Sequence, residues 1–212
     1  MSEALVEAIV HKLLDHLAGW GFPVGVQQRL GSFVIIWGVV ETSLESAVWA
    51  LGNEEVQNRR PSTDKTSASA WFEEFKSKAK ALDSRLDPIS DLAVNAAVQV
   101  MNYRHAVAHG WLLPDAVAPT FYRNPNWNGE VRNRPKGVAR VTEEELDLAI
   151  DAAWTLAIFI MVVRDACSNR DLLDGLDKMT PDLIRAIAAG DRLDAHTQLM
   201  LREELQVTDR RR

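Results

Sequence analysis

The stretch PISDLAVNAAVQVMNYRHAVAHG, from Pro88 to Gly110, decides the fold because it predicts one long helix that is buried on two sides. A proline suits the first turn of a helix, and a glycine often follows the last turn. At about 100° per residue, one face carries Leu92, Ala96, Val100, Tyr103 and Val107, and the opposite face carries Val94, Ala97, Val98, Met101 and Ala108. A helix that is apolar on both sides is covered on both sides.

Two arrangements can cover the second face of this helix. In the first, another copy of the chain lies on it, and we expect an obligate homodimer for this reason. The helix predicted to end near Cys167 is similarly apolar over 157–163, which favours the same conclusion. In the second arrangement, C-terminal helices of the same chain cover these faces.

The rest of the chain predicts an all-α helical bundle. Apolar residues recur at helical spacing on either side of the quoted stretch. Thr142 and Glu145 have the spacing of a capping box, which marks the start of a helix that runs to about 167. The other predicted helices cover residues 4–17, 26–51 and 70–82.

Residues 111–140 interrupt the helical pattern. They contain four prolines and two short β-favouring pieces, so we expect a small irregular or β-hairpin insertion directly after the central helix. Residues 1–170, with this insertion, are expected to form the bundle. Residues 171–212 are expected to form a C-terminal helical appendage of one or two helices.

Composition excludes several classes of protein. The 212 residues are 47% hydrophobic and 25% charged, which supports a packed core and excludes an intrinsically disordered chain. Cys167 is the single cysteine, so an internal disulfide and a cysteine zinc site are excluded. The first residues are acidic, unlike a signal peptide, and the longest apolar run is far shorter than the ~20 residues that span a bilayer. We expect a cytoplasmic protein with no membrane contact.

Arg104 and His109 are the candidate catalytic residues. They lie at the end of the predicted central helix, where the helix dipole favours an imidazolium. An imidazole moves protons near neutral pH, and a guanidinium holds a phosphate, which is the pairing that in-line phosphodiester chemistry requires. The two side chains are about 140° apart on an ideal helix, so they converge only through a distorted last turn or between two subunits. The alternative is that both residues bind only the last free carbonyls of the helix.

His105 and Glu41 are candidate supporting residues. His105 and His109 are four residues apart, but no acid lies at ligand spacing, so we expect no metal site and interpret His105 as a hydrogen-bonded core or interface histidine. Glu41 stands in the apolar stripe of residues 26–51, where a carboxylate needs a cation or strong donors. It would hold Arg104 in place, or it would accept backbone or indole N–H groups. No cofactor is expected, because the sequence lacks a glycine-rich phosphate loop.

The insertion carries the candidate RNA-binding residues. The formal net charge of the chain is −6, yet residues 111–140 hold five Lys/Arg against two Asp/Glu. Aromatic faces between cations suit unstacked bases on a charged backbone. The alternative is a packed surface hairpin with solvated arginines. The residues expected to contact RNA are Trp111, Tyr122, Arg123, Arg132 and Arg134.

The motif Arg104-x4-His109 resembles the HEPN superfamily, whose members are α-helical bundles with an R-x4-6-H motif late in a long helix. The polar residue after the arginine, here His105, and the trailing Ala-His-Gly are similar to the family. So is the upstream helix with Glu41, because family members often carry an acid there. The resemblance covers roughly residues 27–165, in helix order as well as in motif.

This resemblance implies a metal-independent endoribonuclease that cleaves single-stranded RNA as a homodimer, with the two motifs meeting in a cleft. His109 would act as general acid/base at the ribose 2′-hydroxyl or at the leaving oxygen. Arg104 would stabilise the scissile phosphate, and the product would be a cyclic phosphate.

The resemblance also implies a biological setting. Family members often serve as toxins or in defence against phage, and some pair with an antitoxin or another partner protein. One toxin branch carries a tyrosine two positions after the histidine as the target of nucleotidylation, and this chain has Trp111 there. The alternative function is a non-catalytic dimeric module that binds a nucleotide, RNA or a partner protein through the same residues.

Overall fold

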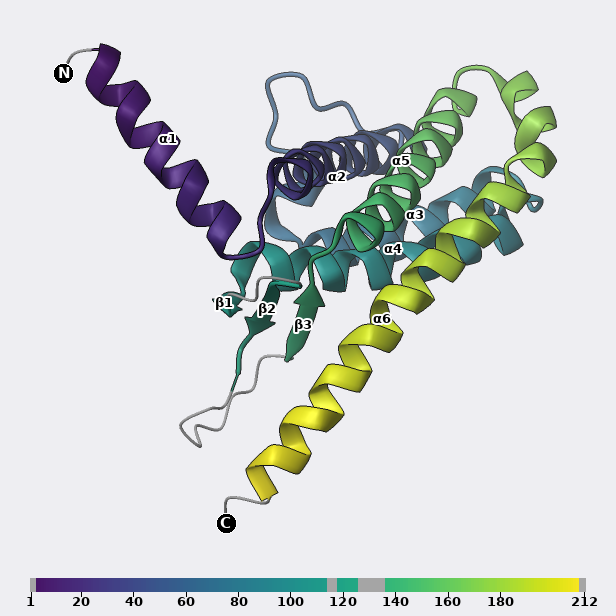
Figure 1. Ribbon diagram of the computed structural model, residues 1–212. Coiled ribbons are helices and arrows are strands. Elements are labelled where there is room, and N and C mark those ends of the chain that lie inside the picture. Colours follow the sequence, from purple (N-terminus) through teal and green to yellow (C-terminus); the bar gives the residue numbers. More distant parts are fainter. Residues whose placement is uncertain (1–2, 114–117, 126–135, 210–212) are drawn as a thin grey trace.

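The computed structural model describes residues 3–113, 118–125 and 136–209, and this part of the chain is mostly helical (Figure 1). The α-helices are α1 (Glu3–Gly19), α2 (Val24–Leu51), α3 (Ala68–Leu82), α4 (Leu86–His109), α5 (Glu143–Ala166) and α6 (Thr180–Asp209). The 3-10 helices are η1 (Ser62–Lys65) and η2 (Arg170–Lys178). The strands are β1 (Trp111–Leu113), β2 (Thr120–Arg123) and β3 (Gly137–Arg140). The predicted all-α bundle with a small β insertion is confirmed.

Local capping explains where the helices begin. The backbone N–H of Glu145 donates to Thr142 Oγ1 at 3.2 Å, and the N–H of Thr142 donates to Glu145 Oε2 at 3.1 Å. This is the capping box that the sequence predicts, and it starts α5. Glu145 is itself buried and also meets His196 Nδ1 of α6 at 2.5 Å, so one carboxylate joins the start of α5 to the last helix.

The core lies between α2, α4 and α5, and α6 covers it from the outside. α2 packs along α5, and α6 packs against both α4 and α5. On the second face of α4, Val94, Ala97 and Met101 are buried within the chain, whereas Val98 and Ala108 are exposed. Ala157, Phe159, Ile160 and Val163 near the end of α5 are buried as well. α6 therefore covers much of these faces within one chain, and the homodimer stays a prediction.

Residues beyond 170 share this core. The apolar face of α6 is buried against the bundle, together with two leucines of η2. The buried residues of this segment are Leu173, Leu176, Leu183, Ala186, Ala189 and Leu193.

The insertion is a three-stranded antiparallel sheet in the order β1-β2-β3, rather than a simple hairpin. It sits against the end of α4 (Figure 1). The hydroxyl of Tyr103, a buried residue of α4, donates to the carbonyl oxygen of Arg140 in β3 at 2.8 Å. This bond ties the helix turn that carries Arg104 to the sheet.

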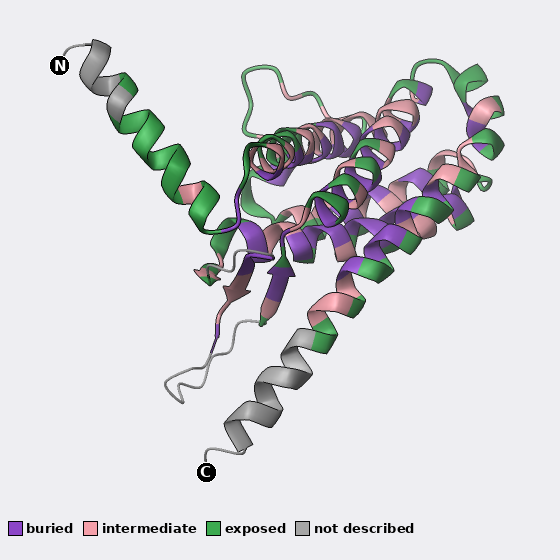
Figure 2. Cartoon of the chain, viewed as in Figure 1, coloured by how far each residue is buried: buried purple, intermediate pink, exposed green. Residues whose placement is uncertain are grey.

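α1 is the exception to this compact packing, because it projects from the bundle (Figure 2). Its described residues are exposed over most of its length, and it meets the core only near Leu17.

α2 and α5 are long and apolar enough to cross a membrane by length and composition alone. In the bundle they pack against each other, and a third of the most apolar window of α2 and half of that of α5 are buried. Core helices pass the same test, so these two helices are weak evidence for a membrane protein. The cytoplasmic location stays a prediction.

Candidate functional site

The last turns of α4 place the motif residues at the edge of the bundle. Tyr103 and Ala106 are buried and face the core, which turns Arg104 and His105 toward a half-buried position and leaves His109 exposed. The helix stays α-helical to His109, so its last turn is not distorted. Arg104 and His109 therefore do not converge through a distorted last turn, which leaves a meeting between two subunits as the other route.

Glu41 of α2 holds Arg104. Arg104 Nη2 lies 3.8 Å from Glu41 Oε1, and the indole Nε1 of Trp37 donates to the same oxygen at 2.7 Å. Both of the contacts considered for Glu41 are thus present at once. Trp37 is fully buried, so the carboxylate is fixed by a rigid donor one helical turn before it. Glu41 in turn forms an ion pair with the guanidinium of Arg104, whose side chain is only 26% exposed.

Arg123 of β2 lies near enough to His105 for its charge to act on the imidazole. Arg123 pairs with Gly137 across β2 and β3, and a Cβ placed on Gly137 would lie 3.5 Å from Ala106 Cβ and 3.6 Å from Arg123 Cβ. The side of the sheet that carries Arg123 therefore faces α4 between His105 and His109. Arg123 belongs to the same cluster of charges as the motif.

His105 is at the centre of this cluster. Burial is the main cause that lowers its pKa, and the positive charges of Arg123, Arg104 and His109 lower it further, whereas Glu41 acts in the opposite direction. The rings of His105 and His109 have their centroids 6.0 Å apart. A half-buried imidazole surrounded by cations is favourable for binding an anion such as a phosphate.

Removing Arg123 should raise the pKa of His105 toward that of a free histidine, because one of the charges that oppose its protonation is lost. We expect this for Arg123→Ala in an NMR titration of the imidazole. Arg140→Ala is the matched control, since Arg140 is an exposed cation of the neighbouring strand that does not act on His105. An unchanged His105 titration in Arg123→Ala would contradict this placement of the arginine.

Gly110 sets the distance between the helix and the sheet. Its φ of −85° is open to any residue, so the glycine is not required by its backbone conformation. A Cβ at this position would meet Ala106 O at 2.3 Å, Phe121 Cβ at 3.0 Å and Tyr122 N at 3.1 Å. The chain can leave α4 and pass directly under β2 only because position 110 has no side chain.

The described part of the predicted RNA-binding set, Trp111, Tyr122 and Arg123, lies on both sides of the small sheet. Trp111 and Tyr122 are directly opposite on β1 and β2, so they share one side of the sheet, and Trp111 is 69% exposed. Arg123 follows Tyr122 and therefore points to the other side, toward α4. Strand alternation therefore places the two aromatic residues and Arg123 on opposite sides of the sheet. Arg132 and Arg134 lie outside the described residues.

Residues 3–113, 118–125 and 136–209 contain no cluster of three or more His, Cys, Asp or Glu side chains that could hold a metal ion. The charged groups that act on His105 are Arg123, Arg104, His109 and a single acid, Glu41.

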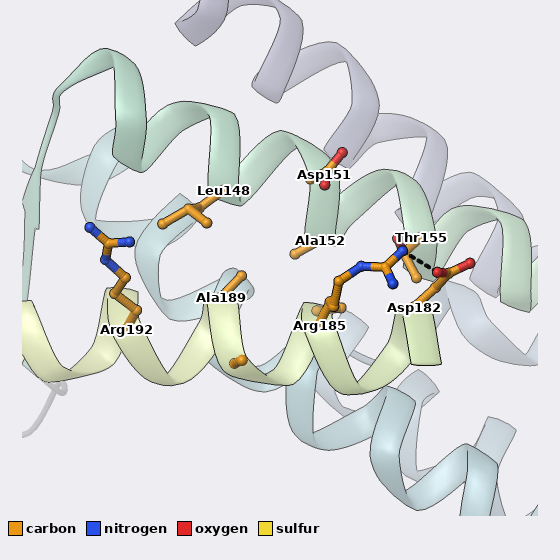
Figure 3. Close-up of a pocket in the computed structure, with 10 residues that line it drawn as sticks. Leu148, Asp151, Ala152, Thr155, Asp182, Arg185, Ala189 and Arg192 are labelled. Carbon is orange, nitrogen blue, oxygen red and sulfur yellow. Dashed lines mark hydrogen bonds and ion pairs between the residues drawn. The ribbon is translucent and has the colours of Figure 1, made fainter. Parts of the chain in front are cut away.

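Two hollows of the described surface lie away from the motif. One of about 350 Å³ separates α5 from α6 and is drawn in Figure 3. Asp151 and Thr155 line it from α5, and Arg185 and Arg192 from α6. Both arginines are already paired, Arg185 with Asp182 and Arg192 with Glu144, so this groove has no excess of one charge. A second, apolar hollow lies beside α1.

Sequence patterns alone did not find the role of Arg123. It was grouped with the aromatic residues because of its position in the sequence, although the alternation Tyr122-Arg123 already places the two side chains on opposite sides of a strand. Asn102 was also overlooked. It lines a polar cavity of about 110 Å³ together with Arg123, Lys136 and Gln198.

Comparison of the chain with protein-family models, with curated proteins and with solved structures finds no match. The resemblance at Arg104 and His109 therefore stands on its motif and its helical setting.

Proposed function

We propose that this protein is a metal-independent endoribonuclease that cleaves single-stranded RNA. The observation that carries the proposal is the arrangement at the end of α4, where His105 and His109 are neighbours, where the positive charges of Arg104 and Arg123 act on His105, and where Glu41 pairs with Arg104. Such a site attracts a phosphodiester and supplies imidazoles beside it. RNA carries a nucleophile next to each phosphate, so it can be cut without a metal-activated water.

His109 is the general acid/base of the proposed reaction. It is exposed, so a ribose can reach it. The imidazole accepts the proton of the 2′-hydroxyl, the 2′-oxygen attacks phosphorus, and the bond between phosphorus and the 5′-oxygen breaks. The leaving 5′-oxygen takes up a proton from water, the imidazolium returns its proton to the solvent, and the products are a 2′,3′-cyclic phosphate and a 5′-hydroxyl. Arg104 binds the negative oxygens of the phosphate, and His105 supports its orientation.

A homodimer belongs to this proposal. Because α4 is regular to its end, Arg104 and His109 of one chain point in different directions. Two copies that meet near α4 would bring the arginine of one chain close to the histidine of the other. A toxin or phage-defence role, with an antitoxin or another partner protein, is proposed on the resemblance alone.

The test is cleavage of a mixed single-stranded RNA by the purified protein in excess EDTA. We expect fragments that end in a cyclic phosphate. A substrate with one 2′-deoxyribose 5′ of a mapped cleavage site should lose cleavage at that site only, because the nucleophile is missing there. Cleavage that persists at the deoxyribose would contradict the mechanism. If RNA is bound and not cut, the non-catalytic binding module becomes the better explanation.

A further inference from the structure

α1 carries a row of large apolar side chains that nothing in the bundle covers. Ile9 is 53% exposed and Leu13 is 57% exposed, and Val10, Leu14 and Trp20 are also exposed. Their spacing places them along one side of a helix that is about 25 Å long. A helix of 17 residues gains little stability alone in water, so this side of α1 needs a partner.

An apolar groove of about 600 Å³ lies at the base of α1. Leu30, Val34 and Ile35 of α2 form one wall, and Phe22, Leu112 and Phe121 form the other. Leu17 lines this groove and also a second hollow on α1 itself, which includes Ile9 and Leu13. The two hollows therefore form one continuous apolar surface, which we call the α1–α2 face.

α1 does not fill its own groove, because its direction is fixed by the turn that follows it. The N–H of Phe22 donates to Leu17 O at 2.9 Å, and the N–H of Gly21 donates to Ala18 O at 3.1 Å. Gly21 has φ of 84°, which favours glycine, so the turn is a defined structure rather than a free hinge. Leu17 already stands at the edge of the groove, and the rest of α1 leads away from it (Figure 1).

The exposed apolar area of the α1–α2 face and the charge of α1 both favour another copy of the chain as the binding partner. The exposed parts of Ile9, Val10, Leu13, Leu14, Trp20, Val24, Val34 and Ile35 add to an apolar area on the order of 800 Å², which is what a stable interface covers on each partner. Helices that lie on membranes are rich in Lys and Arg, whereas α1 carries Glu3, Glu7 and Asp15 against Lys12.

We propose that two copies of this chain associate by exchanging α1, so that the apolar side of each α1 lies in the groove of the other copy. One chain offers both a protruding apolar helix and an apolar groove, and a two-fold axis satisfies both at once. Gly31 and Gly38 leave the outer side of α2 free of bulk, which allows close approach.

The test uses two full-length variants. One carries a substitution on the apolar side of α1, and the other carries a substitution in the groove. Leu13→Glu places a charge on the helix, and Ile35→Glu places a charge at the groove. We expect the wild-type protein to sediment as a dimer and each variant to associate at least about 100-fold more weakly, because a charge would be buried without a partner. Ile184→Glu is the matched control, since Ile184 is 54% exposed on α6, away from this face, and it should remain dimeric.

Mixing the two variants separates exchange from other modes of association. The Ile35→Glu chain keeps an intact α1, and the Leu13→Glu chain keeps an intact groove, so one good contact is restored in the mixed dimer. With one variant labelled with ¹⁵N, native mass spectrometry should detect the mixed dimer and little of either homodimer. A monomeric wild type, a Leu13→Glu dimer of full strength, or a mixture that stays monomeric would each overturn the proposal. Circular dichroism confirms that both variants fold. No RNA cleavage is measured, so the result is independent of the proposed activity.

Discussion

His109→Ala should lower the rate of RNA cleavage in EDTA by roughly 10²–10⁴-fold, which is the usual contribution of a positioned general acid or base. The imidazole is exposed at the end of α4, and its loss leaves no cavity in the core, so the fold and the thermal stability should stay close to those of the wild type. The measurement is the initial rate on a defined single-stranded RNA, with cyclic phosphate as the product detected.

The matched control for this variant is His11→Ala. His11 is an exposed histidine on α1, far along the chain from the motif, and its loss should leave the rate unchanged. Equal rates for His109→Ala and the wild-type protein would show that the cleavage does not use this site. A similar loss in both variants would also contradict the assignment, because His11 has no role in the proposed reaction.

Gly110→Ala should destabilise the protein by about 1–3 kcal/mol, the range for forcing a methyl group into a packed interior. The added Cβ would lie 2.3 Å from Ala106 O, so either the end of α4 or the first strand must move. Phe121 and the backbone of β2 lie at 3.0–3.1 Å and restrict that movement. Urea unfolding measures the free energy, and the same movement should reduce cleavage because it shifts His109.

Gly175→Ala is the control for the glycine prediction. A Cβ at position 175 would meet no atom within 4 Å, so this substitution should leave the free energy of unfolding almost unchanged. If Gly110→Ala has the same free energy of unfolding as Gly175→Ala, the close approach between α4 and β2 does not require a glycine at position 110.

The helices were predictable because their signals are local. Apolar periodicity and the capping box at Thr142 and Glu145 placed the starts and ends of α2, α4 and α5 within a few residues. The cover of α4 was not predictable in the same way. A sequence shows that a helix is apolar on two sides, but it does not show whether α6 or a second chain lies there.

The candidate site was predictable only in part, for a similar reason. Glu41 could be linked to Arg104 because a carboxylate in an apolar stripe must find a donor or a cation. The bond from Trp37 to the same oxygen depends on side-chain geometry along α2, which spacing alone left open. Arg123 reaches His105 only through the pairing of β2 with β3, and that register is a long-range property.

The pairing of α2 with α5 determines how early the core of the bundle can form during synthesis. α2 ends at Leu51 and α5 begins at Glu143, so at roughly 5–20 residues per second the ribosome takes on the order of ten seconds to reach the partner of α2. Until then α2 can pack on α3 but lacks α5, its main partner helix. α4 gains its cover from α6 later still. The bundle around the end of α4 therefore cannot be completed until α6 has left the ribosome.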